Sequence, residues 1–190
     1  MQSITTDQFR EWSNRLRRSD RDAYAEVFRA TYEALFRYAW RFTRDDEAAY
    51  DVLQETYMKL WLIREEVDPD RSLKALLYHM VRNFALNQQR YRKRHATDSL
   101  DEQLVEPGRD ETIEADLDAS DLNHRLQDWI KDLPPRRREA FMLSRYEGLS
   151  HEEIARVMGL TPKTVNNHIV LALQHLRELM RTRESDPLST

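Results

Sequence analysis

The sequence predicts an all-α fold in which two small helical domains are joined by an acidic linker. Three observations support this prediction. Only three of the 190 residues are glycine and 34% are charged, as is typical of chains built from long helices rich in Leu, Arg and Glu. Apolar residues recur with helical spacing through most of the chain. That spacing is lost in one long acidic stretch, which therefore separates two domains.

The composition excludes several classes of protein. The chain has no cysteine, so disulfides and thiolate metal sites are excluded, and a cytoplasmic location is expected. The first residues lack the apolar core of a signal peptide, and no apolar run approaches the ~20 residues that span a membrane. Direct insertion into a membrane is therefore not expected.

The net charge of −4 conceals two segregated blocks. From Arg71 to Arg94 there are seven Lys or Arg residues and no acid, whereas from Asp98 to Asp121 there are ten acids and one Arg. A nucleic-acid binder needs local basic surface, and the first block supplies it although the whole chain is acidic.

Residues 1–96 are predicted to form the first domain, with four helices. Each expected helix starts at a Thr, Asp or Ser, whose side-chain oxygen can accept a hydrogen bond from an unpaired backbone N–H group of the first turn. Pro69 interrupts the pattern before the fourth helix, since proline lacks the N–H donor. The predicted helices are about Thr5–Arg17, from Asp20 or Asp22 to about Thr43, from Asp45 or Asp46 to about Glu66, and from Ser72 to about His95.

Residues 97–117 are predicted to form the acidic linker, because they have no helical period and contain Pro107-Gly108. Residues 118–185 are predicted to form the second domain. Its four helices are expected at Leu122–Leu133, Arg136–Tyr146, Ser150–Met158 and Thr161–Arg183, with breaks at Pro134-Pro135, Gly148 and Gly159.

The last two of these helices have the pattern of a helix-turn-helix. Ser150 and Glu153 have the spacing of a capping box, in which each side chain bonds the backbone of the other. Gly159 can adopt the left-handed conformation that ends a helix, and Thr161-Pro162 restarts the next. This combination favours DNA binding over the alternative, a pair of helices that serves only packing.

The exposed face of the last helix is predicted to contact duplex DNA, through short amides and hydroxyls that suit base edges and phosphates. Few cations accompany them, and Val170 and Leu171 stand where basic residues would help, so this domain alone should bind DNA weakly. The arginine run at 136–138 either adds backbone contacts or is a solvated helix start. The predicted contact residues are Thr161, Lys163, Thr164, Asn166, Asn167 and Arg138.

The helix expected from residue 45 or 46 to 66 carries an unusual polar face. Acids, an amide, a methionine and a tryptophan share it, which is typical of a surface that docks on another protein. The alternative is burial against another helix of the same domain. The predicted docking residues are Asp51, Gln54, Glu55, Met58 and Trp61.

The basic helix that follows is predicted to bind single-stranded or melted nucleic acid. Cations suit phosphates, while amides and aromatic rings suit bases, and here Tyr78 and Tyr91 are interleaved with them. The alternative is a solvated charged helix. The predicted contact residues are Lys74, Arg82, Asn83, Asn87 and Arg90.

Taken together, these segments resemble the extracytoplasmic-function (ECF) family of bacterial RNA polymerase sigma factors over roughly residues 23–180. Residues 51–61 resemble the helix that binds the core polymerase, and residues 78–90 the helix that melts and reads the minus-ten element. Residues 133–141 resemble the start of sigma domain four, and residues 150–177 its minus-thirty-five reader. The chain departs from the family pattern at Tyr50, Leu76 and Asn87, where an acid, a tryptophan and an aspartate are usual.

The resemblance implies two helical domains like sigma domains two and four, with core RNA polymerase and promoter DNA as partners. The docking residues would bind the clamp helices of the largest polymerase subunit, and the loop at 68–71 would help to hold the melted strand. The linker would thread the polymerase cleft. An anti-sigma factor is a further expected partner, as is common in the family.

No nucleophile–base pair, glycine-rich phosphate loop or metal-ligand cluster occurs in the sequence, so neither an enzyme nor a cofactor is expected. Two other functions stay open on the residues alone. One is a conventional helix-turn-helix regulator that binds duplex DNA without polymerase, and the other is a helical adaptor that binds only protein.

Overall fold

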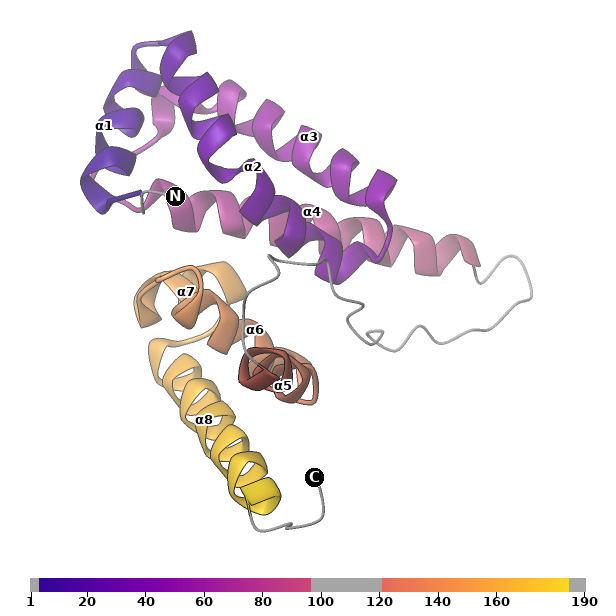
Figure 1. Cartoon of the computed structure of the whole chain (residues 1–190). Helices are drawn as coiled ribbons and strands as arrows, with labels where there is room; N and C mark the ends of the chain where they lie inside the picture. The colour runs from indigo at the N-terminus through magenta and orange to yellow at the C-terminus, as the bar shows by residue number, and fades with distance from the viewer. Residues whose placement is uncertain (1–3, 97–120, 185–190) are drawn as a thin grey trace. The chain divides into compact units, whose positions relative to one another are not determined.

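The computed structural model describes residues 4–96 and 121–184, and it confirms the predicted fold class. All regular structure within these two ranges is helical, and it forms two compact units (Figure 1). The predicted acidic linker at 97–117 lies outside the described residues, and so does its expected path through the polymerase cleft. Each unit is described below by itself.

Within residues 4–96, the first unit contains four α-helices and one short 3-10 helix. The helices begin where the capping pattern predicts, because Thr5, Asp20 and Asp45 each accept hydrogen bonds from backbone N–H groups of the first turn. The Ser72 hydroxyl does the same for the last helix, accepting from Ala75 N at 3.1 Å. The elements are α1 (Thr6–Arg17), α2 (Arg21–Thr43), α3 (Asp46–Leu62), η1 (Arg64–Glu66) and α4 (Leu73–Ala96).

The third helix is shorter than predicted, since it ends at Leu62 and η1 replaces its expected last turn. The guanidinium of Arg64 donates a hydrogen bond to the carbonyl of Trp61 at 2.8 Å. A carbonyl at the end of α3 thus has a side-chain donor, which compensates for the helical bond it lacks.

Helices α2 and α3 form an antiparallel pair joined by tilted and edge-on aromatic rings. Tyr24 meets Trp61, Phe28 meets Tyr57 and Phe36 meets Tyr50, with ring centroids 5.2, 4.7 and 4.8 Å apart. Steps of four and eight residues along α2 are matched by steps of four and seven residues backward along α3. The rings therefore fix the register of the pair, and α4 packs against both helices (Figure 1).

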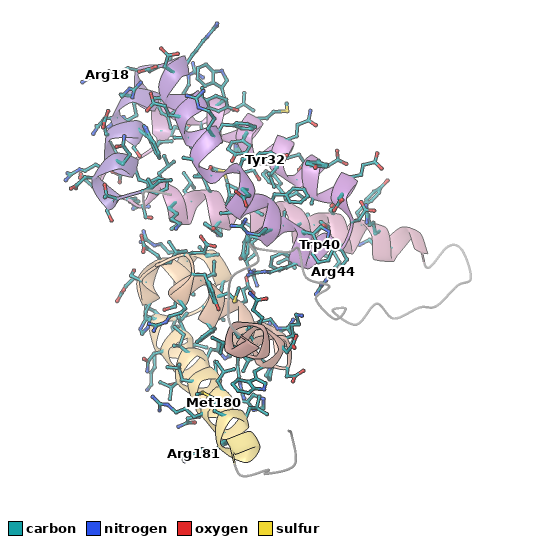
Figure 2. The ribbon with its side chains drawn as sticks, in the orientation of Figure 1. Arg18, Tyr32, Trp40, Arg44, Met180 and Arg181 are labelled. Atoms are coloured by element: carbon teal, nitrogen blue, oxygen red, sulfur yellow. The ribbon has the colours of Figure 1, made fainter. Side chains whose placement is uncertain are left out.

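Arg44 makes the turn between these two helices. Its backbone is left-handed, with φ of 54°, and its N–H donates to the carbonyl of Trp40 at 2.8 Å. Its guanidinium lies 5.0 Å from the centre of the Trp40 ring, and Figure 2 shows the two side chains together at the end of α2. The cation–π contact helps to offset the cost of a left-handed non-glycine residue.

Helix α1 is fixed to α2 by packing and by an ion-pair network. Its apolar face, made of Phe9, Trp12 and Leu16, is buried. The Trp12 indole N–H donates to Glu26 at 2.7 Å, and Arg15 pairs with both Asp20 and Glu26. The hydrogen bonds from Arg15 hold the pKa values of these two carboxyls below their usual range.

The second unit is a small bundle with its own core. Glycines make two of its turns, since Gly148 between α6 and α7 and Gly159 between α7 and α8 both adopt φ of 66°, which glycine tolerates without strain. The elements are α5 (Asp121–Lys131), α6 (Pro135–Arg145), α7 (His151–Met158) and α8 (Pro162–Glu184). One core cluster is made of Trp129, Ile130, Leu133, Phe141, Ala172 and Leu176.

Candidate docking and nucleic-acid surfaces

The predicted docking face of α3 is exposed. Asp51, Gln54, Glu55 and Met58 all point away from the core, and Met58 exposes 57% of its surface. The opposite face of the helix is buried through residues Ala48, Ala49, Val52, Leu53, Thr56, Tyr57 and Leu60. Burial against another helix of the same unit, the alternative for this face, is therefore excluded for these four side chains.

Trp61 differs from its neighbours on this face because it is half-buried. Its ring lies edge-on to Tyr24, and the Arg64 guanidinium lies 4.6 Å from the ring centre. The sequence predicted it as an apolar anchor for a partner. In the structure it also anchors the end of α3 to the start of α2.

An apolar strip lies beside the docking face, and sequence reasoning missed the part of it that α2 contributes. Phe28, Tyr50 and Leu62 are exposed, and Tyr32 and Phe36 are partly exposed between them along α2. The signal was present in the sequence as aromatic residues at every fourth position of α2, from residue 24 to residue 40. The acids of α3 thus border an aromatic surface that could hold the apolar side of a partner helix.

Tyr57 is buried beneath this strip and forms hydrogen bonds with two residues of α2. The Tyr57 hydroxyl lies 2.9 Å from the Thr31 hydroxyl, and the Tyr57 carbonyl accepts from the Tyr24 hydroxyl at 3.0 Å. Burial raises the pKa of Tyr57 to about 12. This phenol supports the docking face from behind and does not reach the surface.

The predicted nucleic-acid face of α4 carries its amides and cations on successive turns. Asn83, Asn87 and Arg90 are exposed, while Lys74 and Arg82 are half-buried. The Asn87 amide oxygen accepts from Arg90 at 3.0 Å. One ring nitrogen of His79 shares a hydrogen bond with the Asn83 amide nitrogen at 2.9 Å, which orients that amide.

Tyr78 does not lie on this face, contrary to the prediction from the sequence. It is 1% exposed, and its ring packs against Tyr38 with centroids 4.9 Å apart. The Lys74 ammonium lies 6.0 Å from the Tyr78 ring centre, so the tyrosine contributes to the surface only by supporting that cation. Tyr91, the other predicted aromatic, is 64% exposed and can stack on a base.

The second unit has the geometry of a helix-turn-helix. Ser150 accepts from the Glu153 N–H at 3.2 Å, and the Glu153 carboxylate accepts from the Ser150 N–H at 2.7 Å, which completes the predicted capping box. The Thr161 hydroxyl accepts from the Thr164 N–H at 3.2 Å and so caps α8. Ile154, Val157 and Val165 are buried where α7 and α8 cross.

The start of α8 presents the predicted duplex-contact residues. Thr161, Lys163, Asn166 and Asn167 are exposed, and Thr164 is half-buried. Further along the helix, four exposed side chains are apolar, namely Val170, Leu171, Leu173 and Met180, and they alternate with polar and charged ones. Lys163 is the one exposed cation among the described residues at the start of α8, from 161 to 167, which agrees with the expectation of weak phosphate neutralisation.

Arg138 differs from the other predicted duplex contacts because its guanidinium has partners within the unit. It is half-buried, and its guanidinium donates to the carbonyls of Lys131 and Leu133, the latter at 3.1 Å. Arg138 therefore caps the end of α5 and joins it to α6, and its contact with duplex DNA stays a prediction.

Two classes of site are absent from the described residues. Within 4–96 and 121–184, no group of three or more His, Asp or Glu side chains could hold a metal ion. In the same ranges, no helix is both long and apolar enough to cross a membrane.

The two units each match a family model. The model described as Sigma-70 region 2 matches residues 27–95, and the model described as Sigma-70, region 4 matches residues 123–176. The first match contains α3, α4 and most of α2, and the second contains the helix-turn-helix. The predicted contact residues of α3, α4 and α8 therefore all lie inside the matched segments.

Similar proteins span most of the chain. The ECF RNA polymerase sigma factor SigL of Mycobacterium tuberculosis is 31% identical over 162 residues, which cover 82% of this chain and 89% of SigL. The ECF RNA polymerase sigma factor SigE of Mycolicibacterium smegmatis is 28% identical and covers 86% of this chain, but the chain spans only 64% of that relative. The sigma factor RpoE of Bartonella quintana, solved in complex with the anti-sigma factor NepR, is similar with a TM-score of 0.61 and 25% identity, covering 83% of this chain and 96% of that one.

Proposed function

The chain belongs to the ECF family of RNA polymerase sigma factors, and from this premise we propose how its surfaces share the work of initiation. The first unit docks on core RNA polymerase through α3 and holds the melted minus-ten strand through α4. The second unit reads the minus-thirty-five element as duplex through α8. The observation that carries the proposal is the contrast within one unit between an acidic, apolar face on α3 and an acid-free polar face on α4.

The chemistry of the α3 face specifies its partner. Asp51 and Glu55 are exposed acids, so they favour a partner surface that carries Arg or Lys. Met58 and the exposed part of Trp61 supply apolar area in the centre of such a contact. The clamp helices of the largest polymerase subunit, which the family resemblance names, are the proposed partner.

The chemistry of the α4 face suits a single strand. Lys74, Arg82 and Arg90 lie along the helix with Asn83 and Asn87, so phosphates and base edges can both be contacted. The Tyr91 ring adds a stacking surface. A duplex reader would need its contacts concentrated on one short groove-filling segment, whereas these run over about four helical turns.

The second unit supplies contacts to the upstream duplex. Lys163 and Asn167 lie within the first two turns of α8, where a helix-turn-helix meets base edges in the major groove. Because few cations accompany them, free protein binds promoters weakly. Attachment to polymerase then raises the effective concentration of each surface at its own element.

An anti-sigma factor is proposed as a second protein partner. The similar RpoE is solved with such a partner, and the exposed acidic and aromatic surface of α2 and α3 is the docking area that we propose for a partner of this chain. A regulator that covers this area would exclude the polymerase.

The proposed role is that of an initiation factor and not of an enzyme, since the polymerase performs the catalysis. It places the protein in the cytoplasm, where bacterial transcription occurs. A conventional regulator is not favoured, because the Sigma-70 region 2 match and the α3 face have no role in a protein that binds duplex DNA without polymerase. An adaptor that binds only protein does not account for the helix-turn-helix.

The deciding experiment mixes the purified full chain with bacterial core RNA polymerase. Co-elution, followed by specific initiation from a promoter library, is the expected result and identifies the promoter. Absence of association, together with tight duplex binding by the free protein, would overturn the proposal in favour of the conventional regulator.

A further inference from the structure

The segment that connects the docking helix α3 to the strand-binding helix α4 is tied to helix α1 at both of its ends. At the start, Arg64 Nε donates to the Ser19 hydroxyl at 2.8 Å, in the turn that follows α1. At the end, an Arg10 guanidinium nitrogen pairs with an Asp70 carboxylate oxygen at 2.6 Å. We call residues 63–72 the connector. Contacts with α1 and with the turn that follows it therefore hold the connector at both ends.

The connector itself has few internal supports. Val67 is buried, and Asp68 accepts from the Asp70 N–H at 3.0 Å to close one tight turn. Arg71 adds an exposed ion pair with Asp68 at 3.3 Å. The first half of the connector is also held by η1, but residues 68–71 have only this turn, a backbone hydrogen bond from the Arg71 N–H to the Asp68 carbonyl at 3.1 Å and this ion pair, so they need contacts from outside to adopt a single conformation.

Helix α1 can supply those contacts because it is itself rigidly placed. Phe9, Trp12 and Leu16 are buried, and Arg15 joins α1 to both Asp20 and Glu26. Arg10 lies on the exposed side of this anchored helix. Its reach to Asp70 crosses 60 residues of sequence, so the contact is made only when the whole unit is folded.

The charges at this position add a second reason for the contact. The connector carries four acids, and the proposed strand path runs over the two that lie next to the start of α4, Asp68 and Asp70. A bare carboxylate would repel the phosphates of the melted strand. Arg71 faces one of these acids and Arg10 the other.

From these observations we propose that Arg10 is a positioning residue for promoter opening: its ion pair with Asp70 fixes the connector where the melted strand meets α4. The inference rests on the proposed function. It assigns a role to α1, which lies before residue 27, where the Sigma-70 region 2 match begins. Arg10 need not touch DNA for this role.

The pair is exposed, with 61% and 78% of the two side chains accessible, so its contribution to global stability is small. Its effect is expected in the geometry of the connector. Loss of the contact should therefore reduce strand opening while leaving the fold and the polymerase affinity unchanged.

The test uses charge reversal in the full chain, assembled with core polymerase on a promoter selected by the unaltered protein. Arg10→Asp places two carboxylates together and should reduce permanganate reactivity of unpaired thymines in the minus-ten element about fivefold or more. The double variant Arg10→Asp/Asp70→Arg restores the pair in reverse and should recover most of that reactivity. Arg18→Asp, which makes the same charge change at an exposed position that points outward in Figure 2, is the matched control and should have no effect.

Each alternative outcome has a distinct meaning. Loss of opening in Arg10→Asp without recovery in the double variant would show that Arg10 acts by itself, for instance on a phosphate, and would overturn the proposal. Full opening by Arg10→Asp would overturn it as well. If the unaltered protein did not bind polymerase at all, the proposed function itself would be wrong. The binding measurement tests that separately from the opening measurement.

Discussion

The indole ring of Trp61 packs edge-on against the phenol ring of Tyr24, with 5.2 Å between their centroids. This contact joins the last turn of α3 to the first turn of α2, and the Arg64 guanidinium lies 4.6 Å from the indole centre. One side chain thus belongs both to the packing of the unit and to the proposed docking face. Met58, one turn earlier on α3, belongs to that face alone.

Alanine at these two positions should therefore give different results. Trp61→Ala is expected to lower the free energy of unfolding by about 2 kcal/mol, because it removes a half-buried ring and an aromatic pair. It should lower polymerase affinity as well, whereas Met58→Ala should lower affinity and leave stability unchanged. Urea unfolding and titration with core polymerase measure the two effects. Equal stability of the two variants would contradict the dual role of Trp61.

The acids of α3 are expected to contribute to polymerase binding through charge. The variant Asp51→Asn/Glu55→Gln keeps the shape of both side chains, and we expect it to weaken polymerase binding by about 1–3 kcal/mol. Its affinity should also depend less steeply on salt, because screening acts on the charges that were removed. Asp132→Asn, at an exposed acid of the second unit, is the control. Parallel salt dependences for all three proteins would show that these acids do not meet cations.

Local signals predicted most of the fold. Helix starts at Thr5, Asp20, Asp45 and Ser150 lie where expected, because a capping hydrogen bond involves only residues within one turn of each other. The same is true of the left-handed turn at Gly159, whose conformation glycine alone adopts without cost. The end of α3 was missed because it depends on the side chain of Arg64.

Side-chain roles that depend on distant neighbours were harder to predict. Periodicity placed Tyr78 on the polar side of α4, but Tyr38, forty residues earlier, covers it. In the sequence Arg138 belongs to a basic run, but in the structure its guanidinium donates hydrogen bonds to carbonyls at the end of α5. A helical period fixes which residues share a face, and only the packed unit fixes what that face meets.

The buried phenol of Tyr57 should make the first unit sensitive to alkaline pH. Burial raises its pKa from the ordinary 10.0 to about 12 in the folded state. Between these values the unfolded chain loses the proton and the folded chain keeps it, so stability is fully present below about pH 10 and falls as pH rises toward 12.

Tyr57→Phe tests this prediction, because phenylalanine cannot ionise. Near neutral pH the variant should be less stable by about 1 kcal/mol, since the hydrogen bond with the Thr31 hydroxyl is lost. Above pH 10 the gap between the two proteins should shrink, as only the unaltered protein then loses this contribution. Urea unfolding at several pH values gives the gap directly, and other titrating groups cancel in the comparison. A gap that stayed constant would contradict the raised pKa.

We expect Asn167 and Lys163 to contribute to upstream recognition in different ways, with the Asn167 amide on a base edge and the Lys163 ammonium on a phosphate. Asn167→Ala is expected to relax the preference at one position of the minus-thirty-five element, at a cost of about 1–3 kcal/mol. Lys163→Ala should weaken binding similarly for all upstream sequences and reduce its salt dependence. Selection from a promoter library by the polymerase complex of each variant separates these effects, and an unchanged minus-ten preference serves as the internal control. If Asn167→Ala left the upstream preference intact, the exposed start of α8 would contact DNA without reading it, and the specificity of the second unit would have to come from DNA shape instead.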